Sequence, residues 1–235
     1  MAAVVLTGTE RTNARMGQAL QDVGFEVLEW SSIELVPVDI SQACIETILS
    51  TDGPLIFVSP GVVDVLERRW PNWMQSLGDR PVLSMGPGTT LALSTLGIRV
   101  EREANPPRVE GMLDVINAHF TSESEITILC GDRTRPELCT QLISMGFDVD
   151  EQQIYRNQAP SSLVREPCSL LAVVYTSPSG AQRILSSNPW LFSVPAVAIG
   201  PTTARWLIDQ EDHHRVHQCA SPTSQDLAEV LASLQ

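Results

Sequence analysis

The chain alternates short apolar runs with stretches in which apolar residues recur every three or four positions. Runs such as Val4 to Thr7 and Leu170 to Tyr175 have the length of buried strands. Met16, Leu20 and Val23 would lie on one face of a helix that ends at a glycine. Repeated alternation of such strands and helices predicts an α/β fold with parallel sheets covered by helices on both faces.

One junction in this pattern combines a strand, a tight turn and a helix start. The apolar run Ala196 to Ile199 predicts a strand, Gly200-Pro201 interrupts it, and Thr202-Thr203 begins a helix. The earlier segment PVLSMGPGTTLAL has the same order of residue types. Backbone N–H groups at such a helix start favour carboxylate or phosphate groups, so both junctions are candidate anion sites.

The two halves of the chain repeat one another. Arg133-Thr134 repeats Arg11-Thr12, and Gly146-Phe147 repeats Gly24-Phe25 in the same register. We therefore interpret the chain as an internal duplication, with copies at about residues 1–120 and 121–235 that each alternate strand and helix about five times. Each copy would form a doubly wound parallel sheet.

Two further strands end in the dipeptide Ser-Pro, at Ser59-Pro60 and at Ser177-Pro178. The duplication alone could account for these pairs, because Ser, Pro and Gly are common at turns. Ligands of open α/β sheets, however, bind outside the carboxyl ends of the strands. All four junctions are predicted at such ends, which favours a binding role.

Composition and charge exclude several classes of function. The chain has 235 residues and a formal net charge of −13, which disfavours nucleic acid and anionic membranes as partners. No apolar run approaches the roughly 18 residues of a transmembrane helix. The five cysteines are scattered without a CxxC pair, which is typical of a reduced, cytoplasmic protein. Neither cysteines nor histidines have metal-ligand spacing, so we expect no metal site.

Several segments, in this order and spacing, carry a resemblance to a known family. They are VVLTG with GFEVLEW, IFVSPGVV, LSMGPGTT, ITILCG with FDVDEQQIYR, AVVYTSPSGA, AIGPTTA and ASPTSQDLAEVL. Over essentially its whole length the chain resembles uroporphyrinogen-III synthase. The resemblance implies two flavodoxin-like lobes joined by a two-stranded connector. Lobe one would comprise residues 1–33 and 167–235, lobe two residues 41–152, and the connectors residues 34–40 and 153–166.

The resemblance also implies a reaction. Enzymes of this family cyclise the linear tetrapyrrole hydroxymethylbilane, with loss of water and inversion of ring D, to uroporphyrinogen III. The proposed route passes through an azafulvene and a spiro intermediate, and it requires no cofactor. Because uncatalysed closure gives the uninverted isomer, the protein would act mainly by positioning its substrate, an octacarboxylate. We expect a cytoplasmic monomer, with hydroxymethylbilane synthase as a candidate upstream partner.

The resemblance implies individual site residues as well. Tyr155 matches the family's tyrosine, which is proposed to assist departure of the hydroxyl group; the alternative is a packing role in the connector. The matched turns supply these candidate substrate-binding residues: Ser59, Pro60, Gly61, Gly86, Thr89, Ser177, Pro178, Ser179, Gly200, Thr202 and Thr203. Helix capping is the alternative for the serines and threonines. Arg133 and Arg135 are further candidates, or solvated surface charges.

The chain departs from the family at three positions where arginine is frequent, which here are Gly8, Gly61 and Cys130. Carboxylate binding would therefore depend more on backbone N–H groups.

Two other functions stay open at this stage. A non-catalytic two-lobed protein could bind a tetrapyrrole or a small anion through the same turns. A nucleotide-binding flavodoxin-like module is less well supported, because the chain contains neither GxGxxG nor GxxxxGK[ST].

Overall fold

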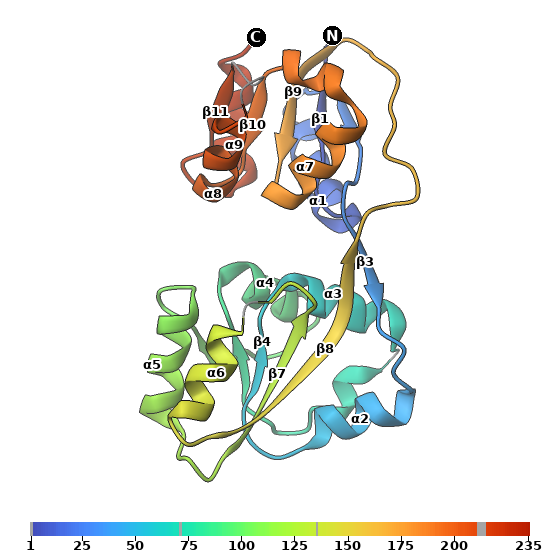
Figure 1. Ribbon diagram of the computed structural model, residues 1–235. Helices are drawn as coiled ribbons and strands as arrows, with labels where there is room; N and C mark the ends of the chain where they lie inside the picture. Colours follow the sequence, from blue (N-terminus) through green and yellow to red (C-terminus); the bar gives the residue numbers. More distant parts are fainter. Residues whose placement is uncertain (1, 71, 135, 211–214) are drawn as a thin grey trace. The chain divides into compact units, whose positions relative to one another are not determined.

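A computed structural model describes residues 2–70, 72–134, 136–210 and 215–235. The chain forms two compact units (Figure 1). Unit 1 comprises Met1–Glu34 and Gln158–Gln235, and unit 2 comprises Leu35–Asn157. The chain thus passes from unit 1 to unit 2 between Glu34 and Leu35, and it returns to unit 1 between Asn157 and Gln158.

Unit 1 contains a five-stranded parallel sheet in the order β11-β10-β9-β1-β2. Its first strand therefore lies between the second and the third, which is the flavodoxin-like order. The strands are β1 (Ala3–Leu6), β2 (Val27–Glu29), β9 (Leu170–Tyr175), β10 (Ala196–Ala198) and β11 (Val216–Gln218). The helices are α1 (Glu10–Asp22), α7 (Pro178–Ser187), α8 (Pro201–Ile208) and α9 (Ser224–Ala232), with a short 3₁₀ helix at Pro189–Ser193.

Alternate strand residues of unit 1 face opposite cores. Val5 and Val173 pack with Leu185 of α7 and Leu207 of α8. Their strand neighbours pack on the other face with α1 and α9, in a cluster that includes Val4, Leu6, Met16, Leu20, Val174, Leu227 and Leu231. Burial on both faces explains why these strands are continuous apolar runs in the sequence.

Unit 2 contains a six-stranded sheet in the order β3-β8-β7-β4-β5-β6. The strands are β3 (Glu34–Pro37), β4 (Leu55–Phe57), β5 (Val82–Ser84), β6 (Arg102–Glu103), β7 (Glu125–Gly131) and β8 (Asp148–Gln158). Here β7 lies between β8 and β4, as β1 lies between β2 and β9 in unit 1. β3 is an additional strand at the edge beside β8.

Helices cover both faces of the second sheet as well. They are α2 (Gln42–Ser50), α3 (Pro60–Arg69), α4 (Pro87–Thr95), α5 (Val109–His119) and α6 (Glu137–Ser144), with a short 3₁₀ helix at Trp73–Ser76. One core contains Phe57, Leu129 and Ile154 with residues of α2, α3 and α4. The other contains Ile56 and Ile128 with residues of α5 and α6.

The helices that follow β1 and β7 end in the same way. Gly24 and Gly146 have φ values of 94° and 93°, in the left-handed region that favours glycine. The N–H group that follows each glycine donates to a carbonyl of the helix, from Phe25 to Leu20 and from Phe147 to Leu142. This shared cap is consistent with the predicted repeat, and the duplication itself stays a prediction.

The predicted fold class is confirmed: both units are α/β with parallel strands in flavodoxin-like order. The segment that the sequence predicts as the second connector begins inside β8, which continues as one strand to Gln158. Among the residues described, no helix is long and apolar enough to cross a membrane.

Candidate functional site

The candidate site of unit 2 lies where the strand order changes direction. In open α/β sheets, the loops that follow the two strands on either side of this point diverge and leave a crevice. In unit 2 these strands are β4 and β7, which pair in parallel. Ser59 follows β4, Gly131 ends β7, and Tyr155 pairs with Gly131 from the adjacent strand β8. Three residues distant in sequence therefore meet at one sheet edge.

The Tyr155 hydroxyl shares a hydrogen bond of 3.1 Å with the Ser59 hydroxyl. Burial is the largest influence on Tyr155 and raises the pKa of its phenol above 10; the Ser59 hydrogen bond lowers it by less. The phenol is therefore neutral at physiological pH and can donate a proton or a hydrogen bond.

A bulge in the pairing of β7 with β8 directs Tyr155 to this position. Cys130 pairs with Gln153, but the next residue, Gly131, pairs with Tyr155, so β8 contains one extra residue. Bulges of this kind redirect a side chain and are common beside active sites. The loop after β7 holds this geometry, because the Asp132 N–H donates to the Tyr155 carbonyl at 3.1 Å.

Tyr155 and Ser59 line a cavity of about 380 Å³. Its other lining residues are Val58, Met85, Arg108, Val109, Arg133, Thr134, Leu138 and Asn157. Apolar side chains thus form much of the wall, and hydroxyl-bearing residues and two arginines add polar groups. Such a combination suits a flat apolar ring that carries acidic substituents.

Arg108 is a residue of this cavity that the sequence analysis missed. Its Nε lies 3.3 Å from Glu110 Oε2, and both side chains are about two-thirds exposed, at 68% and 69%. An exposed ion pair of this kind contributes little to stability, so Arg108 can exchange its partner for a ligand carboxylate. It follows two prolines and directly precedes α5, and neither feature of the sequence indicates a cavity.

The two Ser-Pro turns differ in what their serines do. Ser177 Oγ accepts a hydrogen bond from the Gly180 N–H at 3.2 Å and so caps α7. Ser59 caps no backbone group of α3 and instead contacts Tyr155. The capping alternative therefore describes Ser177, whereas Ser59 is part of the cavity wall.

The remaining candidates lie at strand ends with different exposure. Thr89 and Thr203 are buried, at 3% and 4% exposure, while Thr202 is exposed. Gly86 is the N-cap residue of α4 and Gly200 that of α8, and neither glycine has a side chain that could cap its helix. The residues Pro60 and Gly61 begin α3 beside Ser59, and Pro178 and Ser179 begin α7. Arg133 is exposed at the cavity; Arg135 lies outside the described residues.

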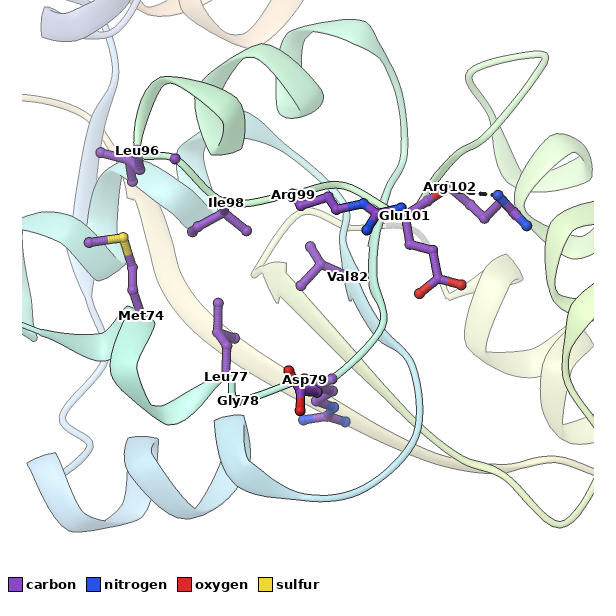
Figure 2. A pocket seen from close by; sticks show the side chains of 12 residues that line it. Met74, Leu77, Gly78, Asp79, Val82, Leu96, Ile98, Arg99, Glu101 and Arg102 are labelled. Atoms are coloured by element: carbon purple, nitrogen blue, oxygen red, sulfur yellow. Dashed lines mark hydrogen bonds between the residues drawn. The ribbon is translucent and has the colours of Figure 1, made fainter.

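A second cavity of unit 2, of about 570 Å³, lies at the amino end of β5 (Figure 2). Met74, Leu77, Leu96 and Ile98 form an apolar part of its wall, and several charged side chains surround them. It contains none of the predicted site residues. The cavity at Tyr155 is therefore the better candidate, because it lies at the carboxyl ends of the strands.

Comparison with known proteins gives a consistent result. The family model described as uroporphyrinogen-III synthase HemD matches residues 14–229. The chain is similar in fold to a crystal structure of uroporphyrinogen-III synthetase from Helicobacter pylori, with 19% identity, full coverage of both chains and a TM-score of 0.64. A mutant uroporphyrinogen III synthase from the extremely thermophilic bacterium Thermus thermophilus has 16% identity and a TM-score of 0.59, with 100% of this chain and 99% of that chain covered. No curated protein sequence matches the chain.

Proposed function

The chain belongs to the uroporphyrinogen-III synthase family, and from this premise we propose that Tyr155 assists the bond-breaking step of the family reaction in unit 2. Enzymes of the family are lyases that cyclise hydroxymethylbilane to uroporphyrinogen III. The observation that carries the proposal is the Tyr155–Ser59 hydrogen bond at the wall of the cavity.

The role of Tyr155 follows from the electron flow. A pyrrole nitrogen supplies electrons, the carbon–oxygen bond of the hydroxymethyl group breaks, and its electron pair leaves with the oxygen. The neutral phenol of Tyr155 donates to that oxygen, so that the leaving group departs as water rather than hydroxide. The substituted carbon of ring D then bonds to the former hydroxymethyl carbon to give the spiro intermediate. Its older bond to the methylene bridge breaks, the bridge bonds to the unsubstituted α-carbon of ring D, and the proton that this carbon loses restores the donor.

The cavity would hold one pyrrole ring of the substrate. Val58, Met85 and Leu138 would contact the ring, and Arg108 and Arg133 would bind its carboxylates by charge-assisted hydrogen bonds. The substrate has eight carboxylates, so further anion sites are needed.

The candidate turns of both units would supply these additional sites. In unit 1, Ser177, Pro178 and Ser179 follow β9, while Gly200 and Thr202 follow β10. Because the N-cap of α8 is Gly200, which has no side chain to cap the helix, the N–H groups of its first turn are suited to a carboxylate. In unit 2, Gly61 is the second residue of α3, as Ser179 is of α7. Gly86 directly precedes α4, as Gly200 precedes α8. Thr203 would act through its backbone N–H, since its side chain is buried. Thr89 would act by holding the shape of its turn, because its side chain is buried and its N–H donates to the Gly86 carbonyl at 3.0 Å.

An isomer analysis tests the proposal. The protein is incubated with freshly prepared hydroxymethylbilane, and the products are oxidised and separated. We expect isomer III from the natural chain, and turnover severalfold to about tenfold slower for Tyr155→Phe, as is typical for loss of one proton donor. Formation of isomer I alone would favour a non-catalytic tetrapyrrole-binding protein. Unchanged turnover in the variant would remove Tyr155 from the mechanism.

We further propose that the enzyme acts as a monomer in the cytoplasm and takes its substrate from hydroxymethylbilane synthase. The five free cysteines fit a reducing compartment. We also propose residues 34–40 and 153–166 as connectors, since both changes of unit fall within these ranges. Light scattering of the purified protein alone tests the monomeric state. The same measurement on a mixture with hydroxymethylbilane synthase tests whether the two proteins associate.

A further inference from the structure

The Tyr155 ring lies against a residue that has no side chain. A Cβ atom added at Gly131 would come within 2.5 Å of Tyr155 Cε2 and 2.7 Å of its hydroxyl oxygen. Real Cβ atoms essentially never approach other atoms so closely, so the ring would have to move. The backbone of Gly131 is outside the left-handed region, so its conformation does not require glycine. The proximity of the Tyr155 ring therefore explains why a glycine is needed at position 131.

The other unit provides an internal comparison. The register that matches Arg11-Thr12 with Arg133-Thr134 also matches Thr9 with Gly131 and Ile33 with Tyr155. Thr9 and Ile33 form a parallel bridge, just as Gly131 and Tyr155 pair in unit 2. In unit 1 the pair consists of a helix-capping threonine and a buried isoleucine. In unit 2 a glycine stands opposite a larger, polar ring.

The structure assigns Gly131 as a positioning residue: its missing side chain lets the Tyr155 ring lie across the end of β7, with the hydroxyl at Ser59 and at the cavity. Gly61 also borders the Tyr155 ring, because a Cβ atom there would lie 3.2 Å from the Tyr155 hydroxyl, although it would meet Leu35 Cδ1 first, at 2.8 Å. The bulge in β8 brings the ring to this place, and Gly131 leaves room for it. The catalytic part of this inference rests on the proposed role of Tyr155.

The substitution Gly131→Ala tests the inference through turnover. We expect a kcat lower by about five- to tenfold with KM changed by less than about twofold, because the displaced hydroxyl acts on the reacting atoms rather than on binding. The matched control is Gly17→Ala in α1 of unit 1, where the added Cβ would meet the end of the Glu29 side chain at 3.2 Å and no site residue. The control should keep the kcat of the natural enzyme.

A double variant separates positioning from general damage. In the Tyr155→Phe background the clash remains but the hydroxyl is absent, so adding Gly131→Ala should lower kcat by less than about twofold. If the two losses multiply instead, Gly131 does not act through the hydroxyl and the inference is wrong.

A readout independent of activity uses the small number of tyrosines. The chain has two, Tyr155 and Tyr175, so labelling tyrosine with ¹³C at Cζ gives two signals that Tyr155→Phe assigns. In Gly131→Ala the ring leaves its buried position, so the pKa of Tyr155 should fall towards 10. An unchanged Tyr155 titration would overturn the positioning role, even if Tyr155→Phe had shown that the tyrosine is not catalytic.

Gly61→Ala gives a second test if Gly131→Ala does not fold, because the Leu35 side chain can move away from the new Cβ, which then presses on the Tyr155 hydroxyl at 3.2 Å. We expect its Tyr155 signal to shift in the same direction and kcat to fall by about two- to threefold. A natural Tyr155 titration together with natural kcat in Gly61→Ala would then count against the inference.

Discussion

At the residue scale, the Ser-Pro motif occurs twice, and its two serines have different roles. Ser177 caps α7, whereas Ser59 contacts the Tyr155 hydroxyl. We expect Ser177→Ala to lower the free energy of unfolding by about 1 kcal/mol, as loss of an N-cap does. Ser59→Ala should change stability less but slow turnover severalfold, because it frees the phenol to rotate. Urea denaturation and initial rates measure both; equal stability losses would contradict the distinction.

The same pair makes a prediction about the titration of Tyr155. The Ser59 hydrogen bond lowers the pKa of the phenol, although burial keeps it above 10. Removing the bond in Ser59→Ala should therefore move the pKa further upward, opposite to the change expected for Gly131→Ala. The ¹³C signal of Tyr155 reports the direction, and a downward shift in Ser59→Ala would show that burial changed instead.

Cys130 makes stability depend on pH above the neutral range. Burial raises the pKa of its thiol from 9.0 to about 12, with Glu151 adding to the shift. Below pH 9 the thiol is neutral in both states; between pH 9 and 12 mainly the unfolded chain loses the proton. The free energy of unfolding should then fall by up to about 1.4 kcal/mol per pH unit. Urea titrations of Cys130→Ser should show a shallower slope, while Cys44→Ser, at an exposed thiol, should not.

The sequence supports some site residues better than others. Tyr155 and Ser59 could be expected from the resemblance, and the structure brings them together. The GPGTT and GPTT patterns could not show which threonines face inward, and Thr89 and Thr203 are buried. Arg108 was missed because only the tertiary fold brings the start of α5 beside the end of β7.

At the element scale, periodicity predicts the strands and helices because their buried faces are largely apolar. The extent of one strand is less visible: β8 is mostly polar, and the predicted connector 153–166 begins inside it, so the sequence alone does not show that the strand runs unbroken to Gln158. The bulge that directs Tyr155 also has no sequence signal, since it depends on how Gly131 pairs across strands.

Arg80 links α2, the turn after α2 and β7 through main-chain and side-chain acceptors. Its guanidinium donates to the Gly53 carbonyl at 2.7 Å, the Ile48 carbonyl at 2.8 Å and Thr127 Oγ1 at 2.6 Å. We expect Arg80→Met to lower the free energy of unfolding by about 2–4 kcal/mol, because these acceptors lose a charged donor. Arg102→Met, whose hydrogen bond is to the exposed adjacent Glu101 carbonyl, should change it by less than about 0.5 kcal/mol. A similar effect of both variants in urea denaturation would contradict the proposed link.

At the scale of the whole molecule, each hydrophobic cluster is drawn from one unit. We therefore expect each unit to fold by itself. Unit 2 is continuous, so residues 35–157 can be expressed directly. In unit 1, Arg183 donates to the carbonyls of Ser32 at 3.3 Å and Gln158 at 2.9 Å. The two segments of unit 1 are thus close at this point, and a short glycine linker from Glu34 to Gln158 should join them.

The limits of unit 2 can be tested with two fragments. Residues 35–157 retain Ile154, which is fully buried in the core and whose carbonyl accepts a hydrogen bond from the Val38 N–H. A fragment limited to 41–152, the lobe expected from the sequence, lacks both. Because deletion of one large buried side chain alone costs about 2–5 kcal/mol, the shorter fragment should unfold at much lower urea concentration, or fail to fold. If the two fragments unfold at the same concentration, the end of β8 and β3 contribute nothing to unit 2 and act solely as connectors. If 35–157 shows no cooperative transition, unit 2 depends on the rest of the chain.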